Sequence, residues 1–184
     1  MGKYLVQDLL ETIRYVPWGL LVALGVWAVV QLINRYRKKQ GKVPCRAVPI
    51  ICFFSYLGLL LIITYWSRES GDISIIDWQI GSTLRINNRN TALWVENVLL
   101  FVPYGFCFAW CQTKKAVLLP GICLGFFTSL CIEILQLVTG RGVFQIDDII
   151  TNTLGCFVGV LLFKVFSWFV PGLYRKPNRE EEAE

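Results

Sequence analysis

Long apolar stretches separated by short polar segments dominate the chain. Five stretches approach or exceed the roughly 20 apolar residues that a bilayer-spanning helix needs. They cover residues 16–33, 47–66, 94–111, 116–138 and 146–170. The pattern therefore predicts an all-α integral membrane protein, a bundle of about five transmembrane helices.

The polar segments divide the chain into one membrane domain and a tail. Basic residues directly follow the first apolar stretch, which is typical of a stop-transfer signal and not of a cleaved leader. The first 14 residues have apolar positions near helical spacing, which predicts a short amphipathic helix at the membrane interface. In the long polar segment 67–93, residues 73–80 are apolar enough to lie on the membrane but too short to cross it. We expect a single transmembrane domain over residues 1–170 and a charged cytoplasmic tail over 171–184.

Basic residues fall unevenly on the two sides of the expected spans. If the spans alternate in direction, 11 Lys and Arg residues lie on one side and 6 on the other. The richer side includes the connection between the first two spans, with Arg35, Arg37, Lys38, Lys39, Lys42 and Arg46. Because basic connections stay in the cytoplasm, the amino terminus is expected outside and the carboxyl terminus in the cytoplasm.

Composition agrees with a membrane protein and disfavours other classes. Apolar residues make up 55% of the chain, and the mean hydropathy is +0.53. The net charge is +5, and the basic residues lie beside apolar runs and form no stripe along the chain. This distribution favours membrane anchoring over nucleic-acid binding. Histidine is absent and the 7 cysteines contain no Cys-x-x-Cys, so the usual zinc patterns are missing and the cysteines are interpreted as packing residues. No cofactor is predicted, although acidic side chains leave a divalent cation as an alternative.

Charged and amide side chains inside the last three spans are the main functional candidates, because such groups are costly in a bilayer. In the expected topology they share one depth, in or just above the outer third of the membrane: Glu96, Asn97, Glu133, Gln136, Arg141, Asp147, Asp148 and Asn152. Their convergence from three helices predicts one outward-facing polar pocket. Glu133 lies deepest, so it is either neutral or paired with a cation such as Arg141.

Helical spacing places several candidates on shared faces. One face of the last span carries Asp148, Asn152, Gly155 and Gly159. Its Gly-x-x-x-Gly pair lets another helix approach closely. One face of the third span carries Asn97, Phe101 and Gly105. Pro103 interrupts the backbone ladder of that span and frees a carbonyl for a neighbour or a water.

Simpler structural interpretations of the same residues remain open. The amide side chains can be interhelical hydrogen-bonding groups, namely Asn97, Gln136 and Asn152. Asp147 and Asp148 can complement the dipole at the start of a helix. A Gly-x-x-x-Gly pair can serve packing alone.

Three strings, in order, resemble the signatures of VanZ-like membrane proteins. The first is Asn97 with Phe101-x-Pro103-x-Gly105, and the second is Glu133-x-x-Gln136 followed by Arg141. The third is Asp147-Asp148 followed by Asn152-Thr-x-Gly155-x-x-x-Gly159. Together they cover about residues 94–164. An Asn-Leu-x-Pro-Phe type segment, which many relatives carry after the second span, is not found here, so ligand specificity is the least transferable inference.

The resemblance implies a multi-pass protein of the bacterial plasma membrane, linked to resistance to glycopeptides such as teicoplanin. It implies no established reaction. Ligand-binding roles would fall to Asn97, Glu133, Gln136, Arg141, Asp147, Asp148 and Asn152. Structural roles would fall to Phe101, Pro103, Gly105, Gly155 and Gly159.

Three functions are compatible with these observations. The first is a protein that binds a lipid-linked or peptidyl cell-envelope molecule, with the bilayer, a lipid-linked cell-wall precursor or a glycopeptide as partner. The second is a membrane enzyme in which Glu133 and Asp148 act as an acid/base pair on a lipid headgroup. The third is a transporter or flippase, which the lack of an internal repeat disfavours.

Overall fold

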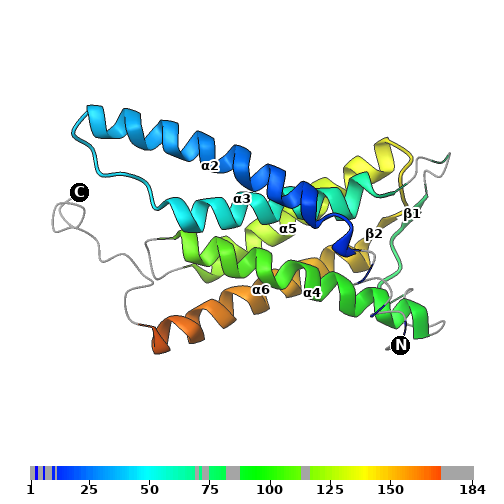
Figure 1. The fold of residues 1–184 in the computed structure, drawn as a ribbon. Coiled ribbons are helices and arrows are strands. Elements are labelled where there is room, and N and C mark those ends of the chain that lie inside the picture. Colours follow the sequence, from blue (N-terminus) through cyan, green and yellow to red (C-terminus); the bar gives the residue numbers. More distant parts are fainter. Residues whose placement is uncertain are drawn as a thin grey trace.

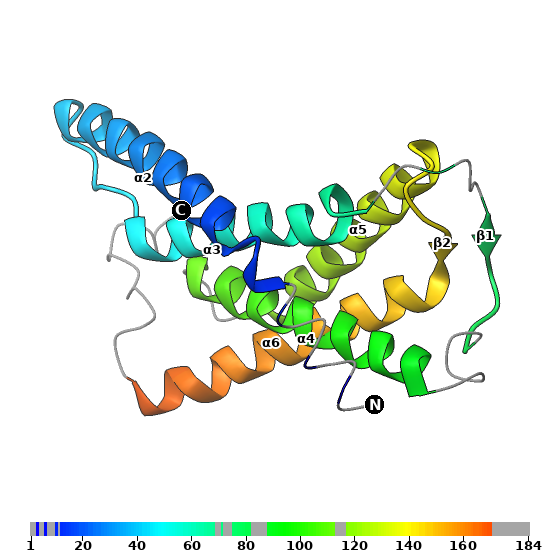
Figure 2. The same ribbon diagram turned by 45° about the vertical axis from the view of Figure 1, so that its right-hand side comes forward.

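The protein is a bundle of long helices with two short strands at one end (Figures 1 and 2). The structure, a computed structural model, describes residues 3, 6, 10, 12–68, 71, 75–81, 88–112 and 117–170. Its long helices are α2 (Val16–Lys39), α3 (Ala47–Leu61), α4 (Asn88–Cys111), α5 (Leu118–Val138) and α6 (Ile146–Phe169). A π-helical turn, η1 (Ile62–Trp66), continues α3.

Within the described residues, five helices are long and apolar enough to cross a membrane, which confirms the predicted all-α class. The sequence predicts the third span over residues 94–111, but its helix, α4, already starts at Asn88. The sidedness of the termini stays a prediction. Most of the expected amino-terminal amphipathic helix and all of the tail 171–184 lie outside the described residues.

The two ends of the bundle differ, and we name them for the features they carry. The strand end holds β1 (Ile76–Asp77) and β2 (Phe144–Gln145), together with the starts of α4 and α6 (Figure 1). The basic end, on the left in Figure 1, holds the last turns of α2, α4 and α6. Consecutive helices therefore run back and forth between the two ends.

Within the apolar segment 73–80, residues 76–77 form a strand, and contact of this segment with the membrane stays a prediction. β1 pairs with β2 in parallel, with Ile76 opposite Phe144. The Phe144 N–H donates to the Ile75 carbonyl at 3.0 Å. Near a membrane, unpaired backbone groups are costly, so pairing is favoured over an isolated extended segment. The Gly71 N–H also donates to the Gly140 carbonyl at 2.8 Å, which ties the loop after η1 to the turn after α5.

Helices α4 and α6 pack backbone against backbone. Gly155 lies against the Val98 carbonyl oxygen and Gly159 against that of Val102, so a Cβ at either glycine would overlap that oxygen. Gly105 on α4 makes the reciprocal approach to the α6 backbone. The helix that meets the glycine face of α6 is therefore α4, and only glycine permits this separation.

Tyrosine hydroxyl groups connect α3 and α5 to α4 near Pro103. This proline lies inside α4 and has no backbone N–H, so the helix lacks one backbone hydrogen bond there. The Tyr56 hydroxyl of α3 donates to the Leu100 carbonyl at 2.7 Å. On the other side, the buried Tyr104 hydroxyl lies 2.9 Å from the Thr128 hydroxyl of α5. The main core therefore lies between α3, α4, α5 and α6, with Leu60, Phe101, Tyr104, Ile132 and Cys156 as its buried members.

Helix α2 lies on the outside of this core (Figures 1 and 2). Val30 is its one buried residue. Most of its large apolar side chains are exposed, including Trp18, Leu24, Trp27 and Leu32. An apolar surface of this extent suits contact with lipid, which agrees with a span at the edge of the bundle.

Candidate functional site

The polar candidates gather at the strand end from three helices. Five of them are buried, as is Ser129 beside them, each with an exposed fraction of 8% or less: Ser129, Glu133, Gln136, Asp147, Asp148 and Asn152. We refer to these six, with the half-buried Asn97 and with Arg68, as the polar cluster. All the ligand-binding candidates from the sequence except Arg141 belong to it.

A chain of hydrogen bonds links α4, α6 and α5 through this cluster. The Asn97 amide donates to Asp148 Oδ1 at 2.8 Å. The Asn152 amide donates to the Ser129 hydroxyl at 2.9 Å, and that hydroxyl lies 3.5 Å from the Asp148 carbonyl oxygen. Sequence reasoning did not select Ser129, because a single serine in an apolar helix gives no signal of its own. The face carrying Asp148 and Asn152 thus contacts both neighbouring helices.

The carboxylate of Glu133, a residue of α5, lies at the start of α6. Its Oε2 accepts a hydrogen bond at 2.9 Å from the backbone N–H of Gln145, the residue that precedes the helix. A carboxylate at a helix amino terminus complements the positive end of the dipole, and a charged acceptor strengthens the bond. The deepest acidic residue of the sequence therefore ties α5 to β2 and α6.

Gln136 connects the cluster to η1. Its amide Nε2 donates to the Thr64 carbonyl at 2.7 Å, and its Oε1 lies 3.5 Å from Nη1 of Arg68. Arg68 lies two residues beyond the end of η1, and its guanidinium interacts electrostatically with both Glu133 and Asp148. Arg68 is therefore the cation of the polar cluster. From the sequence it could be placed only in the polar segment 67–93. Single π-helical turns of this kind frequently occur at functional sites.

Arg141 does not pair with Glu133, contrary to the alternative drawn from the sequence. Its Nη1 lies 3.1 Å from the carbonyl oxygen of Arg68 and 3.5 Å from that of Trp66. Its guanidinium also lies over the Tyr65 ring at 5.1 Å. The turn after α5 directs this side chain toward the end of η1, where carbonyl and ring acceptors are available. Arg141 therefore supports the segment that carries Arg68.

Asp147 holds the loop segment 75–81, which we call the strap. Its Oδ1 accepts a hydrogen bond from the Gly81 N–H at 2.8 Å. Gly81 has φ +78°, a conformation that glycine adopts readily. In the same segment, the Trp78 ring packs on Phe144 with 5.4 Å between ring centroids. Asp147 therefore anchors the strap as well as occupying the first turn of α6.

One buried acceptor in the cluster stands out. Among the described residues, Oδ1 of Asn152 has no hydrogen-bond partner. A buried polar atom left unpaired costs about 1–3 kcal/mol, which a donor from a water or a ligand would offset. The described residues include no group of three or more acidic or cysteine side chains arranged to hold a metal ion.

A profile of the VanZ/LLP1 family matches residues 15–167, well over half of the chain. The chain belongs to the VanZ/LLP1 family. Together with the five apolar helices, this membership identifies a multi-pass bacterial membrane protein and confirms the resemblance seen in the three strings.

A curated relative agrees with this assignment. The chain is 35% identical over 69 residues to Protein VanZ of Enterococcus faecium, a match that covers 38% of this chain and 42% of that protein. The similarity thus spans about two fifths of the length of that relative. No solved structure is similar to the chain.

The three VanZ-like strings meet in space. The first, on α4, supplies Asn97, the second, on α5, supplies Glu133 and Gln136, and the third, on α6, supplies Asp148 and Asn152. Within the described residues, Oε1 of Glu133 and Oδ2 of Asp148 take no hydrogen bond. Two neighbouring carboxylates can therefore accept donors from a bound molecule or exchange a proton with it.

Proposed function

We propose that the polar cluster binds a lipid-linked or peptidyl molecule of the bacterial cell envelope and that this binding contributes to glycopeptide resistance. Membership of the VanZ/LLP1 family and the similarity to Protein VanZ support a resistance-related role in general. The observation that carries the site is the convergence of buried carboxylates and amides from three helices, one of which, Asn152, has an oxygen with no hydrogen-bond partner among the described residues.

The chemistry of the cluster suits such a ligand. Cell-wall precursors and glycopeptides are rich in amide N–H and hydroxyl donors. Such donors can reach the Asn152 oxygen and the second oxygens of Glu133 and Asp148. Arg68 can pair with a phosphate or carboxylate of the same molecule.

Entry of a ligand requires movement, because the buried members of the cluster have exposed fractions of 8% or less. The strap is the natural moving part. It is joined to the cluster by the Asp147–Gly81 hydrogen bond and to β2 by the Trp78–Phe144 contact. Loop segments commonly open and close over binding sites in this way.

The proposed orientation places the strand end outside the cell, the amino terminus outside and the carboxyl terminus in the cytoplasm. The excess of basic residues at the basic end supports it. We take residues 1–170 as one VanZ-like domain and 171–184 as its cytoplasmic tail. Single cysteines at Gln40 and at Gln79, in a cysteine-free background, report the orientation through an impermeant thiol reagent. Labelling of intact cells at position 79 alone is expected, and labelling at position 40 alone would reverse the orientation.

A second candidate function is an acid/base reaction on a lipid headgroup. The neighbouring carboxylates of Glu133 and Asp148, each with one oxygen not hydrogen-bonded within the described residues, favour it. In that case one carboxyl group donates a proton while the other accepts one. Turnover of lipid-linked substrate by the purified protein, stimulated by Mg²⁺ or Mn²⁺, would favour the enzyme. Saturable binding without turnover would favour the binding protein.

Drug susceptibility tests the proposed function directly. A susceptible Gram-positive host is grown with and without the protein, and inhibitory concentrations of teicoplanin and vancomycin are compared. Expression is expected to raise the inhibitory concentration of teicoplanin more than that of vancomycin, because the resemblance to VanZ-like proteins implies a link to teicoplanin resistance. Equal concentrations with and without the protein, at verified membrane levels, would contradict a role in resistance.

A further inference from the structure

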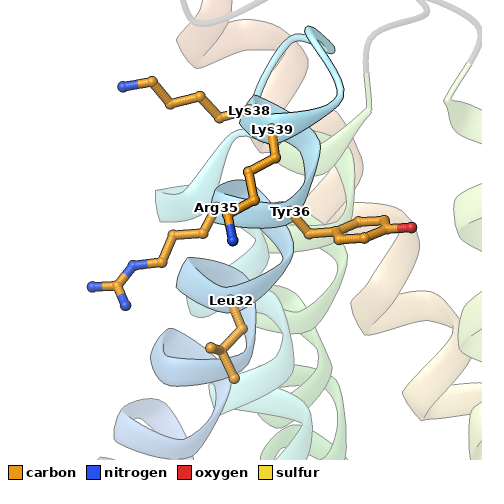
Figure 3. A pocket seen from close by; sticks show the side chains of 5 residues that line it. All are labelled: Leu32, Arg35, Tyr36, Lys38 and Lys39. Atoms are coloured by element: carbon orange, nitrogen blue, oxygen red, sulfur yellow. The ribbon is translucent and has the colours of Figure 1, made fainter.

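The last two turns of α2 line a hollow at the basic end, far from the polar cluster. Its volume is about 630 Å³, and its lining comes from Leu32, Arg35, Tyr36, Lys38 and Lys39 (Figure 3). Arg35 and Lys38 extend to the same side of the helix, whereas the Tyr36 ring extends to the other. The Lys39 side chain runs back along the helix toward Leu32. The hollow is therefore lined by three cations and two largely apolar side chains, with Lys39 between the Arg35–Lys38 side and the Tyr36 side.

These three cations make no ion pair within the described residues. The sequence contains no Asp or Glu anywhere from Thr12 to Arg68, and the described acidic residues belong to the strand end. Two other cations of this region are used differently. Arg37 Nε donates to the Val43 carbonyl at 2.8 Å, and an Arg46 guanidinium nitrogen donates to the Trp110 carbonyl at 3.3 Å. Those two brace the backbone, while the cations of the hollow make no such contact within the described part of the chain.

The hollow lies at the depth of lipid headgroups. Helix α2 has 24 residues. At 1.5 Å per residue it is about 36 Å long, longer than a hydrocarbon core of about 30 Å. Leu32, 63% exposed, is the last leucine before the basic turns, so we expect it at the edge of the hydrocarbon. The cations from Arg35 onward then reach the phosphate layer, and Tyr36 occupies the interface that tyrosine prefers. This reasoning holds for either orientation, because both membrane faces carry headgroups.

We propose that this hollow binds the headgroup of an anionic phospholipid. Arg35, Lys38 and Lys39 contact the phosphate, and an acyl chain runs along Leu32 and Tyr36. A free phosphate ion offers the same charge but no chain, so it would leave the apolar part of the hollow unused. Basic recesses beside transmembrane helices are suited to such lipids.

Titration of the purified full chain in neutral detergent with a fluorescent phosphatidylglycerol tests this site. Saturable binding is expected, without displacement by phosphatidylcholine or by millimolar inorganic phosphate. The triple variant Arg35→Gln, Lys38→Gln, Lys39→Gln is expected to lose affinity by about tenfold or more. Displacement by inorganic phosphate would replace the lipid site with a free-phosphate site.

A matched control separates a site from diffuse surface charge. The control is a second triple variant, which also removes three exposed cations but outside the hollow: Arg14→Gln, Lys42→Gln and Lys164→Gln. Its affinity for phosphatidylglycerol is expected to stay near that of the unmodified chain, and an equal loss in both triple variants would overturn the proposal. Leu32→Ser leaves every charge in place and is expected to weaken lipid binding, which diffuse charge does not predict. Unchanged affinity in this folded variant would likewise overturn it.

Discussion

Charged side chains are buried at one end of the bundle and exposed at the other. At the strand end, Glu133, Asp147 and Asp148 are buried, and each is held by a donor from another element. At the basic end, Arg35 and Lys39 are exposed on the surface of α2. Buried charges are retained only with defined partners, whereas exposed ones interact with whatever surrounds them. The strand end is therefore the candidate site, with a fixed internal geometry, and the basic end is the proposed contact surface for lipid headgroups.

Helix packing shows the same contrast. In the α4–α6 pair, glycine backbone meets backbone, so position and spacing are closely determined. Around Gly25 of α2, by contrast, no atom of the described residues lies within 4 Å of a Cβ built on that glycine. The tightly packed pair is also the one that carries Asn97 and Asp148.

The largest effect is expected from glycine substitution in the α4–α6 pair. In Gly155→Leu or Gly159→Leu, the new side chain must displace the α4 backbone, so destabilisation of about 3 kcal/mol or more is expected. Folded yield, monodispersity and thermal midpoint in detergent measure it. Gly25→Leu is the matched control and should change little. Normal behaviour of both α6 variants would mean that their glycine face does not meet α4.

Much of the fold could be predicted from the sequence. An apolar run long enough to cross a bilayer has few alternative structures, so the five spans follow from length alone. The shared face of Asp148, Asn152 and Gly155 follows from helical periodicity. Pairing of β1 with β2 could not be predicted, because two residues per strand give no alternation to detect.

Parts of the candidate site were hidden for physical reasons. Arg68 lies far from Glu133 in the sequence, and only the course of η1 brings it to the cluster. The direction of Arg141 depends on the turn at Gly140, whose φ is +63°. The pattern indicates which residues are costly in a bilayer, but not which partner each one finds.

Arg68→Gln sharpens the comparison by removing the cation of the polar cluster. Resistance is expected to be lost, because Glu133 and Asp148 then lack their positive neighbour. Inhibitory concentrations of teicoplanin at matched membrane levels measure this. Lys42→Gln, an exposed cation elsewhere, is the control and should leave resistance unchanged. Equal resistance in the two variants would place Arg68 among ordinary surface cations.

Arg141→Ala is expected to have an intermediate effect. The side chain supports the end of η1 and does not contact the carboxylates, so its loss should lower stability by about 0.5–1 kcal/mol through the ring contact. Resistance should fall less than in Arg68→Gln. A thermal midpoint series in detergent and the susceptibility assay measure both. A complete loss of resistance in a folded Arg141→Ala protein would restore Arg141 to the site itself.

The smallest effect is expected from Asn97→Ala, which removes one hydrogen bond between α4 and α6. Interhelical hydrogen bonds in membrane proteins contribute about 0.6 kcal/mol each on average. The Asp148 carboxylate keeps its place through α6, so the fold should persist. Thermal stability in detergent is the measurement. A loss as large as that of Gly155→Leu would show that packing of α4 on α6 depends on this bond and not on the glycines.

The most direct test of the strand-end site is the coupling between Glu133 and Arg68 in the teicoplanin assay. Glu133→Gln preserves size and hydrogen bonding while removing the charge, so resistance is expected to disappear with little loss of folded protein. Because residues of one network are not additive, the double variant with Arg68→Gln should be no worse than the poorer single variant. Asp77→Asn in the strap serves as the control and should be mild. Full resistance in Glu133→Gln, at equal membrane levels, would contradict the account.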